Sequence, residues 1–252
     1  MPTHSTTVTL LLLGAVLCFG ALTFAFWIVL LKRRPLSLRT IAAYLALPKL
    51  QSRSIETGQS LHVSLGTAGV GGADTAATLS GLAVLEGMVE EAVASDSPPT
   101  ITVADPTTLI LAQDALRRAY VRQNNPAGYD PRSVHMIAAQ AMPYAAAAMD
   151  MLAPGRVSAN VMIGAFGPEA AMIVEQGAQR GVAQVVSSSN VTTLPLLYPS
   201  SDHLLVGEEM FVSGAYIGAN PGHVASLVVQ DLFRWLLVLA ILFGAPLIAL
   251  LR

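Results

Sequence analysis

The sequence is short of cysteine and of charged residues. It has one cysteine, Cys18, among 252 residues, which excludes an intramolecular disulfide and a multi-cysteine metal site and leaves the redox compartment open. Charged residues make up only 12% of the chain, hydrophobic residues make up 53%, and the mean hydropathy is +0.57. This composition excludes an intrinsically disordered protein and an ordinary, fully soluble one. We therefore expect a membrane protein.

Two long apolar runs lie near the ends of the chain. Residues 8–31 carry no charge and are long enough as a helix to cross a hydrocarbon core of ~30 Å. A cleaved signal peptide is the alternative, but the start contains no Lys or Arg and the run is too long. Residues 232–251 form the second apolar run and carry Arg234 beside Trp235, a pair typical of a membrane interface. A buried C-terminal helix of a globular core is the alternative for this run. We predict two transmembrane helices, and the lipid bilayer is therefore a partner.

Basic residues follow the first apolar run directly, whereas none precedes it. They are Lys32, Arg33, Arg34, Arg39 and Lys49. By the positive-inside rule, the central region is cytoplasmic and both termini lie outside, in a bacterial cytoplasmic (inner) membrane. We expect residues 32–54 to form a basic juxtamembrane segment, either an amphipathic helix on the inner leaflet or a stalk.

The rest of the chain is acidic. All sixteen acidic residues lie between Glu56 and Asp231, where there are six basic residues, which gives this part a net charge of −10. Such a charge repels nucleic acid and anionic lipid. We therefore expect no nucleic-acid partner.

Short apolar runs alternate with helical patterns between the two predicted spans. The predicted strands are 61–65, 101–104, 133–139, 157–166 and 182–186, and the predicted helices are 74–95, 107–122, 144–152 and 167–180. This alternation is typical of an α/β domain with a mainly parallel sheet. Residues 195–202 are predicted as a loop and 204–217 as a helix, with a strand as the alternative.

The predicted fold is therefore a Rossmann-like α/β domain flanked by transmembrane helices. Its parts are an outer tail (1–7), a first span (8–31), the basic segment (32–54), the cytoplasmic domain (55–222) and a helix running into the second span (223–252).

A glycine-rich turn at residues 66–75 is the best candidate for a ligand site. It leaves the first predicted strand and enters a helix, where glycines let N–H groups approach an anion and the helix end adds partial positive charge. The spacing matches neither GxGxxG nor a P-loop, and the turn has no Lys. We favour a structural turn, with Asp74 or Thr75 capping the helix, over anion or nucleotide binding.

Two further segments are predicted to meet the turn at the same sheet edge. Asp105 follows the second strand, where Rossmann domains place a ribose-binding carboxylate, although a helix N-cap is the interpretation we favour. A serine run ends the fifth strand and is by itself more typical of a polar loop. The candidate binding residues are Gly66, Thr67, Gly69, Gly71, Gly72, Asp74, Asp105, Ser187, Ser188 and Asn190.

The remaining polar residues identify no cofactor, metal or catalytic group. His62 and His135 lie inside predicted strands and are expected to be core or interface histidines, since no metal-ligand spacing is present. Glu208 and Glu209 are expected either in a solvated turn or in an ion pair between subunits with Arg156 or Arg180.

Three segments, 58–72, 111–122 and 204–218, resemble an uncharacterised prokaryotic family of two-span membrane proteins. That family is known only as a domain of unknown function, with sequences from filamentous anoxygenic phototrophs. The resemblance covers most of the central domain and both flanking spans. It implies the architecture and brings no activity or catalytic residue.

Two functions from different classes follow. The central region is rich in small apolar residues and poor in charge, which favours contacts between subunits. The first hypothesis is therefore a non-catalytic, membrane-anchored α/β scaffold or accessory subunit that forms a homo-oligomer or part of a larger membrane complex. The alternative is a nucleotide or phosphometabolite binding protein, possibly an enzyme, that uses the turn at 66–74. The lack of an evident base, metal set or catalytic Lys counts against chemistry but not against binding.

Overall fold

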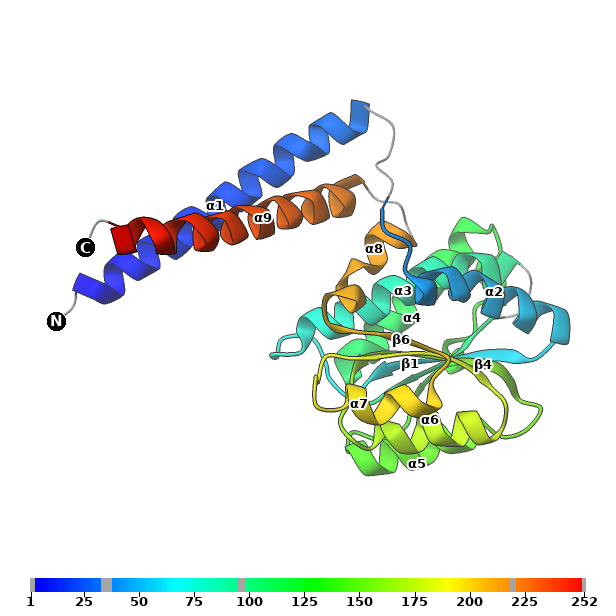
Figure 1. The fold of residues 1–252 in the computed structure, drawn as a ribbon. Coiled ribbons are helices and arrows are strands. Elements are labelled where there is room, and N and C mark those ends of the chain that lie inside the picture. The colour runs from blue at the N-terminus through cyan, green and yellow to red at the C-terminus, as the bar shows by residue number, and fades with distance from the viewer. Residues whose placement is uncertain (1–2, 33–37, 95–97, 218–220, 251–252) are drawn as a thin grey trace. The chain divides into compact units, whose positions relative to one another are not determined.

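The chain forms two compact units (Figure 1). The computed structural model describes residues 3–32, 38–94, 98–217 and 221–250. One unit combines the two terminal segments, up to Leu38 and from Ala219, and the other is Arg39–Gly218. The second unit therefore begins well before residue 55, where the sequence placed the start of the domain.

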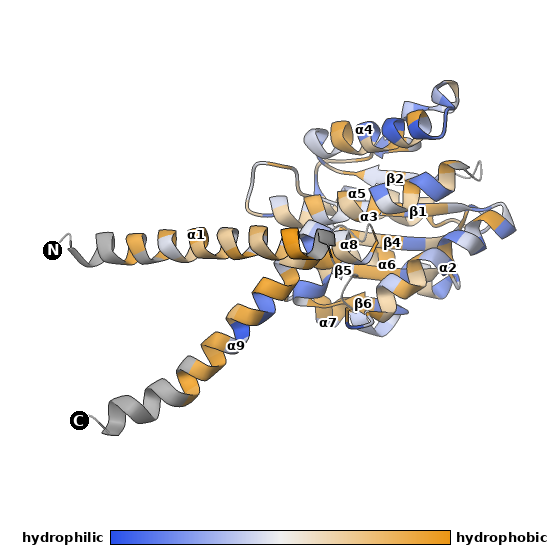
Figure 2. Ribbon diagram, turned by 90° about the horizontal axis from the view of Figure 1, so that it is seen from above, coloured by the Kyte–Doolittle hydropathy of each residue, from blue (hydrophilic) through white to orange (hydrophobic). Residues whose placement is uncertain are grey.

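The terminal unit is a pair of long helices, α1 (Thr3–Lys32) and α9 (Pro221–Leu250). Their contact includes the rings of Phe19 and Phe233, whose centroids lie 5.8 Å apart. The stretches Val8–Val29 and Pro221–Leu239 are long and apolar enough to cross a membrane, and both helices are predominantly hydrophobic (Figure 2). Residues 3–7 of the predicted outer tail belong to α1. Residues 1–2, 33–37, 218–220 and 251–252, including two arginines of the predicted basic segment, lie outside the described residues.

The second unit is built on a six-stranded sheet. Its strands are β1 (Ser60–Gly66), β2 (Thr100–Val103), β3 (Val134–Met136), β4 (Val157–Ala165), β5 (Ala183–Ser188) and β6 (His203–Leu205). Every neighbouring pair is parallel, and the spatial order is β3-β2-β1-β4-β5-β6. The predicted parallel α/β sheet is confirmed. This order is that of doubly wound domains, in which the winding direction reverses between β1 and β4.

Helices cover both faces of the sheet (Figure 1). One face carries α2 (Ala42–Thr57), α3 (Thr75–Ala94) and α4 (Pro106–Arg122), and the other carries α5 (Ala141–Met151), α6 (Ala170–Gln179) and α7 (Leu194–Leu197). Each face has its own cluster of buried apolar residues. The central strands β1 and β4 are buried along almost their whole length, which explains why they read as nearly continuous apolar runs.

Helix α2 is part of this core. Tyr44, Leu47 and Leu50 are buried against the sheet, and the buried Gln51 donates its Nε2–H to Met88 O at 2.7 Å. Residues 42–54 therefore belong to the folded domain, and neither an interfacial helix nor a stalk describes them. Pro48 lies inside this helix at an exposed position.

The chain after β5 also differs from its prediction. The predicted loop 195–202 contains most of α7 and a 3-10 turn at Tyr198–Ser200. The predicted helix 204–217 is instead the end of β6, a 3-10 helix η4 (Gly207–Val212) and a short helix α8 (Ser213–Tyr216). Leu205 is buried as a strand residue, and Gly207 then adopts a φ of +60°, which ends the strand.

The two ends of the second unit are held together by side chains. The Tyr216 hydroxyl donates to Arg39 O at 2.5 Å, and the rings of Tyr216 and Tyr44 stack with centroids 5.1 Å apart. Glu209 forms an ion pair with Arg39, and its carbonyl accepts from the Tyr44 hydroxyl at 2.7 Å. Burial raises the pKa of Tyr44, so this hydroxyl stays a donor. Glu209 therefore has a partner within the chain, and its pairing with another subunit stays a prediction.

Candidate functional site

A crevice of about 530 Å³ lies at the carboxyl edge of the sheet, where the strand order reverses. Its walls come from the turn after β1 and from the ends of β4 and β5. The lining residues are Thr67, Ala68, Asp74, Ala165, Phe166, Gly167, Ser189 and Asn190. Open α/β sheets bind ligands at this reversal point. We call this space the switch-point crevice; of the predicted residues, it is lined by Thr67, Asp74 and Asn190.

The first glycine of the turn has a structural role. Gly66 has a φ of +89°, and a Cβ placed on it would lie 2.6 Å from Ala165 O. The next residue, Thr67, donates its N–H and its hydroxyl to the same carbonyl, at 2.9 and 3.1 Å. The turn therefore starts as a close contact between the ends of β1 and β4, which only glycine permits.

The other glycines shape the turn rather than present it to a ligand. A side chain on Gly69 would overlap the carboxyl group of Asp105. Gly71 has a φ of +109°, and its N–H donates to the Thr75 hydroxyl at 2.9 Å. An added Cβ would meet nothing within 4 Å on either Gly71 or Gly72, but Gly72 lacks the positive φ that makes a side chain unfavourable on Gly71.

Asp105 caps α4. Its Oδ1 accepts from Thr107 N at 2.8 Å, from Thr108 N at 3.4 Å and from the Thr107 hydroxyl. The Thr107 hydroxyl bond is the main cause that lowers the pKa of Asp105, so the group remains a charged carboxylate. The N-cap prediction is confirmed, and Asp105 does not line the switch-point crevice.

The serines that end β5 hold neighbouring strands together. Ser187 donates to Leu205 O at 3.0 Å, and Ser188 donates to Phe166 O at 2.8 Å. Both side chains are buried, and neither lines the crevice. Asn190 does line it, while its Oδ1 accepts from Thr192 N at 3.0 Å.

The next serine makes a contact that sequence reasoning missed. The Ser189 hydroxyl donates to Asp74 Oδ1 at 3.0 Å, linking the loop after β5 to the turn after β1 past the end of β4. Both residues line the crevice. Nothing local in the sequence connects positions 115 residues apart, and only the strand order brings them together.

A second polar feature is a ladder of buried side chains on the sheet face under α5 and α6. It crosses β2, β1, β4 and β5 and is fully shielded from solvent. Its members, in order of contact, are Ser64, Tyr144, Thr102, His62, Asn160 and Gln184. We call this set the polar ladder. Complete hydrogen bonding is what makes such a buried network compatible with a folded core.

The hydrogen bonds of the polar ladder fix the tautomer of His62. Gln184 Nε2 donates to two backbone carbonyls, so Gln184 Oε1 accepts from Asn160 Nδ2 at 2.9 Å. Asn160 Oδ1 therefore accepts from His62 Nδ1 at 2.7 Å, and His62 Nε2 accepts from the Thr102 hydroxyl at 2.9 Å. Burial lowers the pKa of His62 to about 4, which keeps the ring neutral. The expectation of a core histidine is confirmed for His62.

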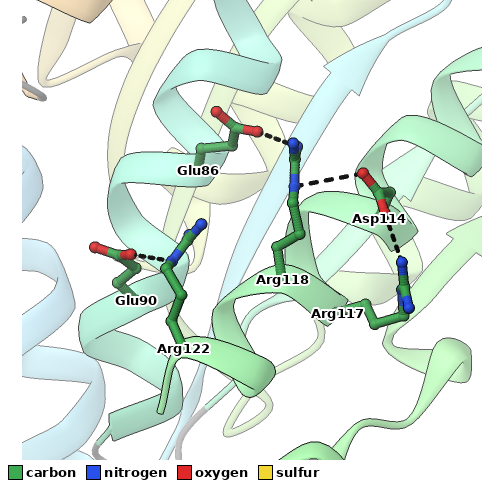
Figure 3. Close-up of polar contacts among 6 residues, drawn as sticks. All are labelled: Glu86, Glu90, Asp114, Arg117, Arg118 and Arg122. Atoms are coloured by element: carbon green, nitrogen blue, oxygen red, sulfur yellow. Dashed lines mark hydrogen bonds and ion pairs between the residues drawn. The ribbon is translucent and has the colours of Figure 1, made fainter.

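Surface ion pairs join α3 to α4 (Figure 3). Asp114 pairs with both Arg117 and Arg118, at 3.2 and 3.3 Å, as its helical spacing predicts. Arg118 also contacts Glu86, and Arg122 contacts Glu90 on α3. These side chains are about half exposed, and such pairs contribute about 0–1 kcal/mol each. Three arginines of an otherwise acidic unit are therefore engaged in surface ion pairs and not in a ligand site.

A protein family described as a domain of unknown function (DUF6754) matches residues 4–251. The chain belongs to this family. The match runs from α1 through the α/β unit into α9, so it includes every element of the architecture. No curated protein and no solved structure matches the chain. The resemblance to an uncharacterised family is confirmed, while the two spans and the phototroph origin stay predictions.

Polar side chains line the switch-point crevice of this family member. Among the described residues, the lining includes the Asp74 carboxylate, the Ser189 hydroxyl and the Asn190 amide, but no His, Cys, Lys or Arg. Across the described residues, no three His, Cys, Asp or Glu side chains are placed to hold a metal ion. The crevice can accept hydrogen bonds from hydroxyl or ammonium groups and donate from an amide.

Proposed function

We propose that the protein is a membrane-anchored α/β domain that binds a small polar ligand in the switch-point crevice without transforming it. The observation that supports this is the position of the crevice, at the one edge of a doubly wound sheet where ligands bind. Its volume, about 530 Å³, lies within the usual range for small-molecule sites. Binding is favoured over catalysis because the described residues that line the crevice supply acceptors and donors but no general base other than a carboxylate.

A thermal-shift screen of the full chain in detergent tests ligand binding. Nucleosides, polyols, amino acids and amines, each with its phosphorylated counterpart where one exists, form the panel. A ligand at 100 times its Kd stabilises a protein by about 2.7 kcal/mol, so we expect at least one compound to raise Tm by several degrees. Ser189→Leu fills the crevice and is expected to abolish that shift.

Ser52→Leu, an exposed change on α2, is the control and should keep the shift. Gly69→Val is unsuitable as a binding variant, because its side chain would displace the Asp105 cap. If no compound shifts Tm, the ligand-binding function is wrong.

We further propose that α1 and α9 both span the cytoplasmic membrane and that the Arg39–Gly218 unit is cytoplasmic, with both termini outside. The support is the two apolar stretches together with the basic residues that follow the first one and are absent before it. On this topology the crevice would sample cytoplasmic ligands.

Protease access tests the topology. In sealed right-side-out vesicles, the central unit is expected to resist an added protease, because the bilayer shields the cytoplasmic side. In inverted vesicles of the same cells, the unit should be cut. Immunoblotting against an epitope in 39–218 reads out both arms, and detergent lysis supplies the positive control. Digestion in right-side-out vesicles alone would contradict the orientation.

A homo-oligomeric scaffold stays the second candidate. Residues 191–198 expose three large apolar side chains: Val191, Leu196 and Tyr198 are 72%, 50% and 71% exposed. Exposed apolar groups this close in sequence favour a contact surface. Mass photometry of the detergent-solubilised protein measures its oligomeric state. A monomer would contradict the homo-oligomeric scaffold.

A further inference from the structure

The turn beside the switch-point crevice lacks features that a phosphate site uses. Phosphate-binding turns direct several N–H groups at the anion and add a Lys. Here the N–H groups of Val70 and Gly71 already donate to threonine hydroxyls, at 3.0 and 2.9 Å. Among the described residues, no Lys or Arg lines the crevice. An incoming phosphate would therefore meet no cationic side chain from this part of the chain.

A carboxylate sits at the positive end of α3 instead. Asp74 immediately precedes the helix, lines the crevice and accepts the Ser189 hydroxyl at Oδ1. This bond fixes the carboxylate from the far side of the crevice. Within the described residues Oδ2 has no hydrogen-bond donor from the protein, so it is available to a ligand. The helix dipole, which would attract an anion, is here offset by an intrinsic negative charge.

Two more carboxylates flank the same edge. Asp105 lies against Gly69 of the turn, and Glu169 accepts from Gly167 N at 2.8 Å, where Gly167 itself lines the crevice. Like charges around a cavity raise the local concentration of cations and lower that of anions.

We infer that the switch-point crevice selects an uncharged or cationic ligand bearing hydroxyl or amine groups and rejects phosphorylated molecules, with Asp74 as the specificity residue. The inference rests on the proposed binding function and names its ligand class. Asp74 Oδ2 accepts from the hydroxyl or ammonium group of the ligand, Asn190 Nδ2 donates to it, and Phe166 forms an apolar wall.

Charged thiol reagents test the sign of the crevice without a known ligand. In a Cys18→Ala background, Ser189→Cys places a near-isosteric thiol in the crevice. The full chain in detergent is reacted with a cationic and with an anionic methanethiosulfonate, and the rate ratio is divided by that of a free small thiol. Both reagents react with the same thiolate, so the fraction of ionised thiol does not affect the rate ratio. A charge about 5 Å away in water changes each rate about fourfold, so we expect a cation preference of at least about fivefold.

Asp74→Asn in the Ser189→Cys protein should reduce this preference at least about threefold, because the shape is kept and the charge is lost. Asp150→Asn is the matched control, since Asp150 is an exposed carboxylate at the end of α5, by the opposite edge of the sheet. It should leave the ratio unchanged. Faster reaction with the anionic reagent would overturn the inference, and so would a cation-to-anion rate ratio that Asp74→Asn leaves unchanged.

Matched ligand pairs separate this inference from the proposed function. Adenosine with AMP, and glucosamine with glucosamine 6-phosphate, differ only by the phosphate, and their Kd values are measured by calorimetry on the full chain. We expect the unphosphorylated member of a binding pair to bind at least about tenfold more tightly, and Asp74→Asn to narrow that gap. Tighter binding of the phosphorylated member would overturn the inference but not the binding function. If neither pair binds and no compound in the thermal-shift panel raises Tm, both the binding function and the inference are wrong.

Discussion

Gly66→Ala is expected to lower the free energy of unfolding of the Arg39–Gly218 unit by about 2–5 kcal/mol. The φ of +89° costs a residue with a Cβ about 1–2 kcal/mol, and the Cβ would also press on the Ala165 carbonyl, which adds about 1–3 kcal/mol of overpacking. Neither partner can move cheaply, because Ala165 O also accepts from Thr67. A domain is stable by only about 5–15 kcal/mol, so this loss is large.

Gly72→Ala is the matched control in the same turn. Its added Cβ meets nothing, so the change should be neutral or stabilising by up to about 1 kcal/mol through the unfolded chain. Denaturant unfolding of the full chain in detergent, followed by near-UV circular dichroism of the tyrosines, gives both values. All six tyrosines lie between Tyr44 and Tyr216, whereas Trp27 and Trp235 lie in the terminal helices. Equal stability of the two variants would show that the β1–β4 contact does not require a glycine.

The sequence predicted the elements of the fold better than their arrangement. The buried parallel strands were visible because each is an uninterrupted apolar run, which depends only on local residues. The strand order was not visible, since it depends on contacts between distant segments. Helix α2 was assigned to a juxtamembrane segment because Arg39 and Lys49 follow the first apolar run. Its residues Tyr44, Leu47 and Leu50 nevertheless mark a helical apolar face.

The sequence predicted that the turn after β1 and the end of β5 lie at the same sheet edge, but it did not predict the side-chain contacts between them. The turn after β1 could be found from its glycines, but the partner of Asp74, Ser189, is set by the strand order. The polar ladder did leave a signal that sequence reasoning missed. Four neighbouring strands each contribute a large or β-branched polar residue to the ladder from within an apolar run, and buried polar residues are more informative than buried apolar ones. They are His62, Thr102, Asn160 and Gln184.

His62 is expected to make the stability of the unit fall on mild acidification. Its pKa is lowered by burial to about 4 in the fold, from the ordinary histidine value of 6.5. The unfolded chain therefore binds the proton first, so the stabilisation is complete above pH 6.5 and is lost as the pH falls from 6.5 to about 4. A pKa gap of this size corresponds to about 3 kcal/mol, and below pH 4 the loss from His62 is complete. The cause is burial in the polar ladder, where a charged ring has no water to solvate it.

His62→Gln removes this titration and isolates its effect. At pH 7 the variant is expected to be less stable by about 1–3 kcal/mol, because an amide directs its donor and its acceptor differently from the two ring nitrogens and weakens both hydrogen bonds. Between pH 6 and 4.5, wild-type stability should fall by about 1.4 kcal/mol per pH unit more steeply than that of the variant. His203→Gln, at the edge strand β6, controls for histidine loss and should keep the wild-type slope. All three proteins contain the same carboxylates, so these do not cause a difference between them. If the free energy of unfolding changes equally with pH in the wild type and in His62→Gln, the fold does not hold His62 neutral.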